Sequence, residues 1–368
     1  MNTLIDVIIP AYKAHKTIVK TLCSICMQTV SDIVQVIIVN DCCPEGSYDN
    51  VVKMFSPLVK VKELKMPENG GPGLARQLGI DEGKSPYFTC IDADDVFADE
   101  LSLNNMLLNI DSNPKVVCAC GVFIELHPDK AIPHHNDMVW MFGKIYRRSF
   151  IKKYDIRFNS TRANEDTGFN TKIKLLCSDS DDESIKWFSE PVYFWNDKPD
   201  SITRVNDCQY SYDQSFCGWT DNMIEAVNFA KQIKPFNGFI TRSAMEFMLH
   251  LYTYYIQTLH KAPIFAKQNF EYCKKYYNLI YKCIEPQITP KIFAEAYSVH
   301  MQHECASGSM LGFIPELTIQ DFMQKLKDEP YNPDDLYDIL AEIPEELREN
   351  NVKCGVCRKD YHKRVDKG

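Results

Sequence analysis

Short runs of apolar and β-branched residues alternate with helical patterns over the first 125 residues of the chain. The predicted strands cover residues 5–9, 35–39, 59–64, 87–91 and 116–124. The predicted helices cover residues 15–28, 48–56, 73–83 and 99–111. Continuous apolar strands separated by helices are typical of a parallel sheet that is covered on both faces. This part of the chain is therefore predicted to be an α/β domain, in which ligands bind beyond the carboxyl ends of the strands.

The pattern changes twice further along the chain. Short aromatic strands and loops follow down to about residue 206, and the rest is helical almost to its end. We therefore predict a first domain over residues 1–206, made of two halves (1–125 and 126–206), and a helical region over residues 207–368 with a short basic tail. Helices within that region are expected at residues 265–284, 290–304 and 317–327, between prolines.

Composition narrows the class of protein. Of the 368 residues, 45% are hydrophobic and 25% are charged, which is ordinary for a globular chain. The net charge of −9 disfavours broad binding to nucleic acid backbones. No secretory signal or membrane-spanning stretch is present in the sequence, so the fifteen cysteines are interpreted as reduced thiols of a cytoplasmic protein.

Acidic residues follow two of the apolar strands. Asp41 ends the second strand, and Asp92 and Asp94 follow the fourth in the order Asp-x-Asp. An isolated Asp-x-Asp is often a solvated turn, but directly after a buried strand it favours a site for Mg²⁺ or Mn²⁺. The segment 68–79 adds glycines before a helix, which suits either close approach of an anionic ligand or a tight turn.

Six segments in order carry a resemblance to a known family: IIPAYK, VIIVND, ENGGPGLARQLGI, FTCIDADD, FGKIYRR and NEDTGF. Together they resemble the family 2 glycosyltransferases of the nucleotide-diphospho-sugar transferase superfamily, over roughly the first 205 residues. The resemblance implies a GT-A fold with a mostly parallel sheet, in which residues 1–125 bind the nucleotide sugar and residues 126–206 seat the acceptor. The C-terminal α-helical region lies outside the resemblance.

The resemblance also implies roles for particular residues near the donor. The backbone after Pro10, at Ala11 and Tyr12, and the side chain of Asp41 would contact the nucleoside. Asp92 would lie near the ribose and, with Asp94, at the metal. Three further residues would lie beside the donor: Gly71, Arg76 and Arg204. Arg204, which ends a Ser-x-Thr-Arg segment, would help to neutralise the diphosphate.

Two departures from the family pattern follow the second strand. Asn40 stands where the family commonly has an aspartate, and Cys42-Cys43 stands where it has Gly-Ser. These changes leave the base of the donor open.

The pair Glu165-Asp166 corresponds to the family's catalytic Glu-Asp pair, whose aspartate resembles a general base. Direct displacement at the anomeric carbon needs a carboxylate that accepts the acceptor hydroxyl's proton, and a cation opposite it to neutralise the departing diphosphate. Without the other motifs, such a pair before a helix would be interpreted as a favourable charge at a helix start. The sequence thus predicts a metal-dependent inverting transferase of hexosyl or pentosyl groups.

Several alternatives stay open from the sequence. A nucleotidyltransferase on a related fold would use the metal without Asp166 as base, and a catalytically silent nucleotide- or glycan-binding module would need neither. The acceptor is a glycan, a protein or a modified nucleic acid base, and an oligomer is compatible with the helical region, which either selects the acceptor or acts as scaffold. Cys354 and Cys357 with His362 form half of a zinc site, which His303 and Cys305 would complete.

Overall fold

The computed structural model describes residues 2–161, 163–196, 209–235, 238–307 and 317–342. It divides the chain into two compact units, Met1–Asp197 and Lys198–Gly368. The predicted boundary at residue 206 and the predicted zinc half-site at residues 354–362 lie outside the described residues. Within the described part of the chain, no helix is long and apolar enough to cross a membrane.

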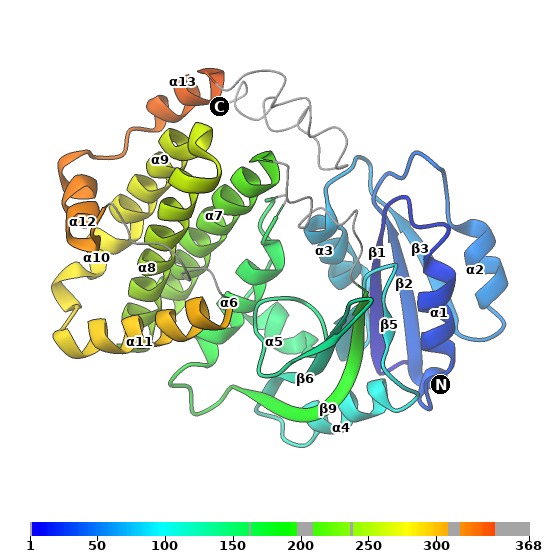
Figure 1. Cartoon of the computed structure of the whole chain (residues 1–368). Helices are drawn as coiled ribbons and strands as arrows, with labels where there is room; N and C mark the ends of the chain where they lie inside the picture. The colour runs from blue at the N-terminus through cyan, green and yellow to red at the C-terminus, as the bar shows by residue number, and fades with distance from the viewer. Residues whose placement is uncertain (1, 162, 197–208, 236–237, 308–316, 343–368) are drawn as a thin grey trace. The chain divides into compact units, whose positions relative to one another are not determined.

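The first unit is built on one nine-stranded sheet with the order β3-β2-β1-β4-β8-β6-β9-β5, and β7 pairs with β6 (Figure 1). Its strands are β1 (Ile5–Ala11), β2 (Val34–Asn40), β3 (Lys60–Lys65), β4 (Tyr87–Cys90), β5 (Val96–Phe97), β6 (Val116–Leu126), β7 (Ala131–His134), β8 (Lys144–Arg147) and β9 (Ser184–Asn196). The pairs β3–β2, β2–β1 and β1–β4 are parallel, as the hydrophobic runs predicted. Because these strands are parallel, the residues that follow β1, β2 and β4 meet at one edge of the sheet.

Beyond β4 the sheet becomes mixed. Strand β8 is antiparallel to both β4 and β6, whereas β6 and β9 run parallel. The short strand β5 pairs antiparallel with β9, which brings the residues after β4 close to the end of β9. The predicted α/β class with a mostly parallel sheet is therefore confirmed, with an antiparallel element that the hydrophobic runs alone did not specify.

Helices cover both faces of the parallel strands (Figure 1). The helices of this unit are α1 (Ile18–Cys26), α2 (Asp49–Phe55), α3 (Pro72–Glu82), α4 (Ser102–Asp111), α5 (Arg148–Lys153) and α6 (Glu165–Cys177). On one face, side chains of α1, α2 and α4 join alternate residues of β1 and β2 in a single buried apolar cluster. Helix α3 packs on the other face, because Gly79 lies directly against Ile8 and Val39. The alternation of side chains along a strand supplies both cores.

The second unit is helical. Its helices are α7 (Gln209–Ile233), α8 (Gly238–Lys261), α9 (Ala266–Tyr276), a π-helical turn (Tyr277–Tyr281), α10 (Lys282–Ile284), α11 (Pro290–Ser307), α12 (Ile319–Asp328) and α13 (Pro333–Glu342). Met248, Leu251 and Ile256 of α8 are buried, so one face of this helix packs against its neighbours. Phe322 of α12 lies against the Tyr252 ring of α8, with 5.3 Å between ring centroids.

A stability prediction follows from the contact between α3 and the sheet. A Cβ atom on Gly79 would lie 2.4 Å from Cγ2 of Ile8, so Gly79→Ala forces the helix and strand apart. We expect this substitution to lower the free energy of unfolding by about 1–3 kcal/mol, the usual cost of overpacking a core. Urea unfolding followed by far-ultraviolet circular dichroism measures the change.

Gly238→Ala is the matched control, because among the residues that the structure describes no neighbouring atom lies within 4 Å of a Cβ at that position. Its free energy of unfolding should stay within about 0.5 kcal/mol of the parent value. Equal stability of the two variants would show that α3 yields to the added methyl group without cost.

Candidate active site

Asp41 fastens the loop after β2 to the start of α3. The backbone N–H groups of Gly70 and Gly71 donate to Oδ1 and Oδ2 of Asp41 at 2.7 and 2.9 Å. The backbone N–H of Asp41 donates to the carbonyl oxygen of Ala11 at 3.0 Å. Gly71 has φ of +84°, a conformation that glycine adopts without strain. The ends of β1 and β2 and the start of α3 therefore form one continuous wall.

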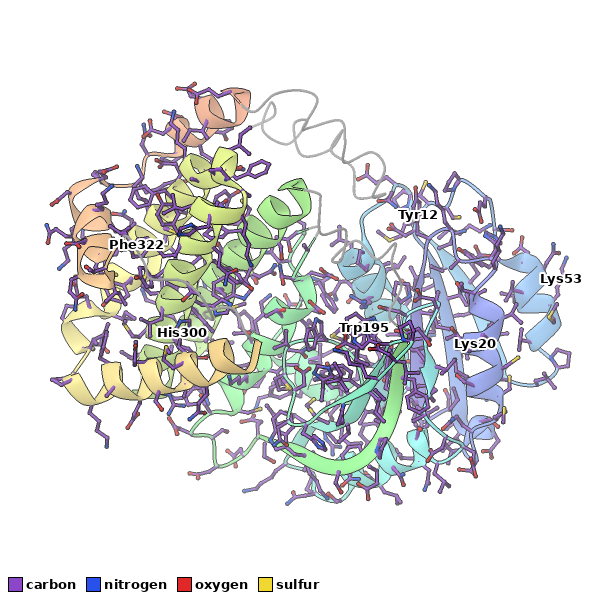
Figure 2. The ribbon with its side chains drawn as sticks, in the orientation of Figure 1. Tyr12, Lys20, Lys53, Trp195, His300 and Phe322 are labelled. Carbon is purple, nitrogen blue, oxygen red and sulfur yellow. The ribbon has the colours of Figure 1, made fainter. Side chains whose placement is uncertain are left out.

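Tyr12 is the exposed side chain of this wall. Ala11 is buried and Pro10 half-buried, whereas 38% of Tyr12 is exposed just beyond the end of β1 (Figure 2). The ammonium group of Lys13 lies 5.3 Å from the centre of the Tyr12 ring. A flat ligand that reaches the carboxyl end of β1 would meet an aromatic face there.

Asn40 shapes the loop that follows β2. Its amide Nδ2 donates to the carbonyl oxygen of Gly46 at 3.0 Å and to Oε1 of Glu63 at 2.8 Å. Its Oδ1 accepts a hydrogen bond from the backbone N–H of Cys43 at 2.8 Å. An ionised aspartate at this position would place a second carboxylate against Glu63, so the amide is the group that fits this neighbour.

A buried arginine joins three parts of the site. Nη2 of Arg76, on α3, donates to Oδ1 of Asp92 after β4 at 2.7 Å. Nη1 donates to Oε1 of Glu165 at the start of α6 at 2.9 Å. Burial alone would lower the pKa of Arg76, but the carboxylates of Asp92 and Glu165 raise it above its ordinary value. The guanidinium therefore stays charged and holds both carboxylates in place.

Glu165 and Asp166 are neighbours in sequence with different surroundings. Glu165 is 5% exposed, and burial raises its pKa although Arg76 opposes the shift. Asp166 is half-buried, and its Oδ1 accepts from the backbone N–H of Thr167 at 2.8 Å. Burial, followed by the charge of Glu165, raises the pKa of Asp166 to about 7. The half-buried carboxylate is thus the one of the pair that is suited to exchange a proton near neutral pH.

The start of α6 is placed by close packing and by one polar contact. A Cβ on Gly73 would lie 2.5 Å from Cγ of Glu165, so glycine is needed there for α3 to approach α6. Asn164, which precedes the helix, has φ of +60°, a conformation that asparagine tolerates better than most residues. Further along α6, Oδ1 of Asn170 accepts from the Tyr146 hydroxyl of β8 at 2.8 Å. The FGKIYRR segment is therefore connected through the core to α6, one residue beyond the NEDTGF segment.

The acidic loop after β4 is held by the end of β9. The Tyr193 hydroxyl donates to Oδ2 of Asp95 at 2.7 Å and accepts from the backbone N–H of Asp92 at 3.2 Å. The Asn196 backbone N–H donates to Oδ1 of Asp95 at 2.9 Å, and its amide donates to the Asp94 carbonyl oxygen at 3.0 Å. Asp95 is buried by these contacts, while Asp94 stays half-buried.

The charges of this loop fit a divalent cation. Burial, then the charges of Asp92 and Asp94, raise the pKa of Asp95 to about 8. The Asp92 side chain is 31% exposed and Arg76 binds its Oδ1, so both Asp92 and Asp94 reach the surface of the site. Carboxylate oxygens are the ligands that Mg²⁺ and Mn²⁺ prefer, and such an ion would offset the repulsion among these carboxylates.

The structure brings several predicted residues together. Arg76 contacts both Asp92 and Glu165, and Asp41 contacts Gly71. Arg204 lies outside the described residues. Three residues that position the acidic loop had no assigned role in the sequence analysis; they are Asp95, Tyr193 and Asn196. The only signals in the sequence were the acidic run after β4 and the aromatic residues of the last strand. The contacts themselves could not be predicted, because they depend on how β9 packs against the loop after β4.

Comparison with known proteins agrees with the resemblance to glycosyltransferases that the sequence motifs carry. Residues 6–164 match the model of glycosyl transferase family 2. The chain is 23% identical over 229 residues to the uncharacterized glycosyltransferase EpsJ of Bacillus subtilis (strain 168), covering 56% of this chain and 64% of EpsJ. It is 25% identical over 208 residues to the poly(ribitol-phosphate) beta-N-acetylglucosaminyltransferase TarS of Staphylococcus aureus (strain Mu50), covering 52% of this chain and 35% of TarS. The chain thus spans less than two thirds of each of these relatives.

A solved structure has the same fold as this chain and confirms the GT-A fold class predicted from the sequence. The crystal structure of S. aureus TarS 1-349 in complex with UDP superposes with a TM-score of 0.53 at 16% identity. The superposition covers 89% of this chain and 90% of that chain.

The Arg76 bridge generates a prediction about stability. Arg76→Met removes the cation and leaves the carboxylates of Asp92 and Glu165 without their partner, so we expect the free energy of unfolding to fall by about 3–5 kcal/mol at pH 8. The loss should be smaller at pH 5. The pKa of Glu165 is already raised, and without Arg76 it rises further, so protonation at low pH removes the uncompensated charge.

Urea unfolding at both pH values measures this difference. Arg157→Met is the matched control, because Arg157 is 49% exposed in its ion pair with Asp81. That exposed pair contributes about 0–1 kcal/mol at most. A loss for Arg76→Met that equals the control would contradict a stabilising role for the bridge.

Proposed function

We propose that this chain is a member of glycosyl transferase family 2, whose model matches residues 6–164, and that it transfers a sugar from a nucleotide-diphosphate donor to a hydroxyl acceptor with inversion at the anomeric carbon. The observation that carries the proposal is the Asp92–Arg76–Glu165 bridge. It links an acidic loop suited to a cation to Asp166, the carboxylate suited to accept a proton. The groups proposed to act on the departing diphosphate and on the acceptor hydroxyl are thereby held in one fixed arrangement.

In this proposal the nucleoside binds at the wall formed by the ends of β1 and β2. The Tyr12 ring and the backbone at Ala11 would face the base, and the N-terminus of α3 after Gly71 would favour the diphosphate. Asp94, together with Asp92, would hold Mg²⁺ or Mn²⁺, which when bound neutralises charge on the departing diphosphate. Because the TarS structure named above contains UDP, a UDP-linked sugar is the first donor class that we propose.

Asp166 is proposed as the general base, and Glu165 as the residue that positions it. Glu165 is buried and bound to Arg76, so its carboxylate is not available to the acceptor. Asp166 is half-buried, and its pKa of about 7 allows it to take a proton from a hydroxyl group and release it to water. The environment thus separates the roles of two adjacent carboxylic acids.

The acceptor is proposed to lie against residues 140–196. Trp195 is half-buried at the end of β9, next to Asn196, which binds the acidic loop (Figure 2). Its ring lies 5.4 Å from Phe142 and 6.1 Å from Trp140, centroid to centroid. Such aromatic surfaces pack well on the apolar faces of sugar rings.

The direct test is a screen of nucleotide sugars by thermal shift, with and without Mn²⁺. A ligand that binds the native state raises the unfolding temperature. The donor that gives a metal-dependent shift is then assayed for slow release of free sugar in the absence of acceptor. Release of a nucleoside monophosphate in place of the sugar would favour a nucleotidyltransferase. Binding without turnover would favour a catalytically silent binding module.

Asp94→Ala tests the metal. We expect it to abolish the Mn²⁺-dependent part of the thermal shift and to lower transfer by at least about 100-fold, since several kcal/mol of charge stabilisation are lost. Asp182→Ala is the control, because that carboxylate is 87% exposed. Full activity of Asp94→Ala in the presence of a chelator would exclude cation-assisted transfer.

Asp166→Asn tests the base. Turnover should fall by about 100-fold to 10,000-fold while donor affinity stays close to that of the parent, because the amide cannot accept the proton. In the parent enzyme, kcat should rise as the pH increases through about 7, where Asp166 loses its proton, and the residual activity of the variant should lack this step.

Glu165→Gln is the comparison for this substitution. Its side-chain oxygen still accepts from Arg76, so the loss of turnover should be much smaller. A pH profile that disappears in Glu165→Gln and persists in Asp166→Asn would assign the base to Glu165.

A further inference from the structure

Three potential metal ligands from two loops converge beside the proposed nucleoside wall. His15 follows β1, and Cys43 and Glu45 follow β2. One ring nitrogen of His15, Sγ of Cys43 and a carboxylate oxygen of Glu45 all lie within 4.8 Å of one another. The loops that carry them are more than twenty residues apart in sequence, so the fold itself brings the ligands together.

The hydrogen bonds of His15 leave one position, between its ring and Glu45, that a proton or a metal ion would fill. Nε2 of His15 lies 3.0 Å from the carbonyl oxygen of Ser47, which only accepts, so Nε2 carries a hydrogen. A neutral ring then has a lone pair on Nδ1, and this atom lies 3.0 Å from Oε2 of Glu45. Two acceptors at that distance need a proton or a metal ion between them.

The same contacts match the surroundings of metal-bound histidines in proteins. A histidine ligand usually donates its second N–H to a backbone carbonyl or a carboxylate, which fixes the tautomer and the ring orientation. Ser47 supplies that carbonyl. The imidazole also stacks on the buried Tyr48 ring, with centroids 4.1 Å apart and planes 10° apart. The hydroxyl of Tyr48 accepts from the backbone N–H of Ala14 at 3.1 Å, so the stacking partner is itself held.

Cys43 is positioned as the third ligand. Its Sγ accepts a hydrogen bond from the backbone N–H of Lys13 at 3.2 Å, which holds the sulfur beside the loop of His15. It is 9% exposed, whereas the His15 and Glu45 side chains are 27% and 51% exposed. An ion can therefore enter from the Glu45 side and reach the sulfur.

We propose that Nδ1 of His15, Sγ of Cys43 and one carboxylate oxygen of Glu45 bind a single Zn²⁺ ion, with water as the fourth ligand. Thiolate and imidazole ligands select zinc over magnesium, unlike the all-carboxylate loop at Asp92 and Asp94. Binding releases the thiol proton of Cys43 and any proton on Nδ1 of His15 to solvent. The ion would join the loops after β1 and β2. The proposal concerns metal binding alone and stands independently of the proposed sugar transfer.

Titration of Co²⁺ into the metal-stripped full-length protein tests the site, because a cobalt–thiolate bond gives a charge-transfer absorption. Cys43→Ser should lose one equivalent of this signal relative to the parent protein. Cys42→Ser is the matched control, since Cys42 is the adjacent exposed cysteine and should leave the signal unchanged. This comparison removes the contribution of the other cysteines in the chain.

Competition with a zinc chelator provides the second measurement. Glu45→Ala and His15→Gln should each weaken Zn²⁺ binding by more than about 10-fold, since changes even outside the ligand shell cost about 10–100-fold. Glu45 is largely exposed, so its variant is expected to fold and keeps the test decisive if Cys43→Ser does not fold. Zn²⁺ affinity of Glu45→Ala equal to that of the parent, or equal loss of cobalt signal in Cys42→Ser and Cys43→Ser, would overturn the proposal.

Discussion

The Arg76 guanidinium is the charge on which the arrangement of the site depends. It pairs with carboxylates that are 16 and 89 residues away in sequence. These contacts hold the loop after β4 and the start of α6 against α3. Removing one member of such a buried group leaves a charge that the protein interior solvates poorly. The glycine at position 73 and the left-handed Asn164 are local conditions that let the three elements approach closely enough for this contact.

More than one carboxylic acid lies near the Arg76 guanidinium, and the surroundings of each acid determine its chemical role. Asp95 and Glu165 are buried and bound by neighbouring groups, whereas Asp94 and Asp166 are half-buried and reach the surface. Burial, followed by the charges of neighbouring carboxylates, raises the pKa values of Asp95 and Asp166. An electrostatic field of this sign favours a bound cation and a carboxylate that can take up a proton near neutral pH, which are complementary requirements of transfer from a diphosphate.

Much of the first unit could be predicted from hydrophobic pattern, because continuous apolar strands report burial on both faces of a sheet. The strands found at Ile5–Ala11 and Val34–Asn40 extend the predicted runs by one or two residues, and α3 begins one residue before its predicted start. Pairings between distant side chains could not be predicted in this way. No local pattern distinguishes Asp95, which is buried by Tyr193, from the half-buried Asp94 beside it. The sequence associated Asp41 with a nucleoside, but gave no indication that its carboxylate binds the backbone of Gly70 and Gly71.

The amide of Asn40 has a consequence for how this chain can vary. Because Nδ2 donates to Glu63 while Oδ1 accepts from Cys43, positions 40 and 63 are chemically linked across neighbouring strands. A change of Asn40 to aspartate is compatible with the fold only if Glu63 becomes a neutral or donating residue at the same time. Homologues should therefore exchange these two residues as a pair, because an evolutionary path that alters one alone would pass through a less stable intermediate.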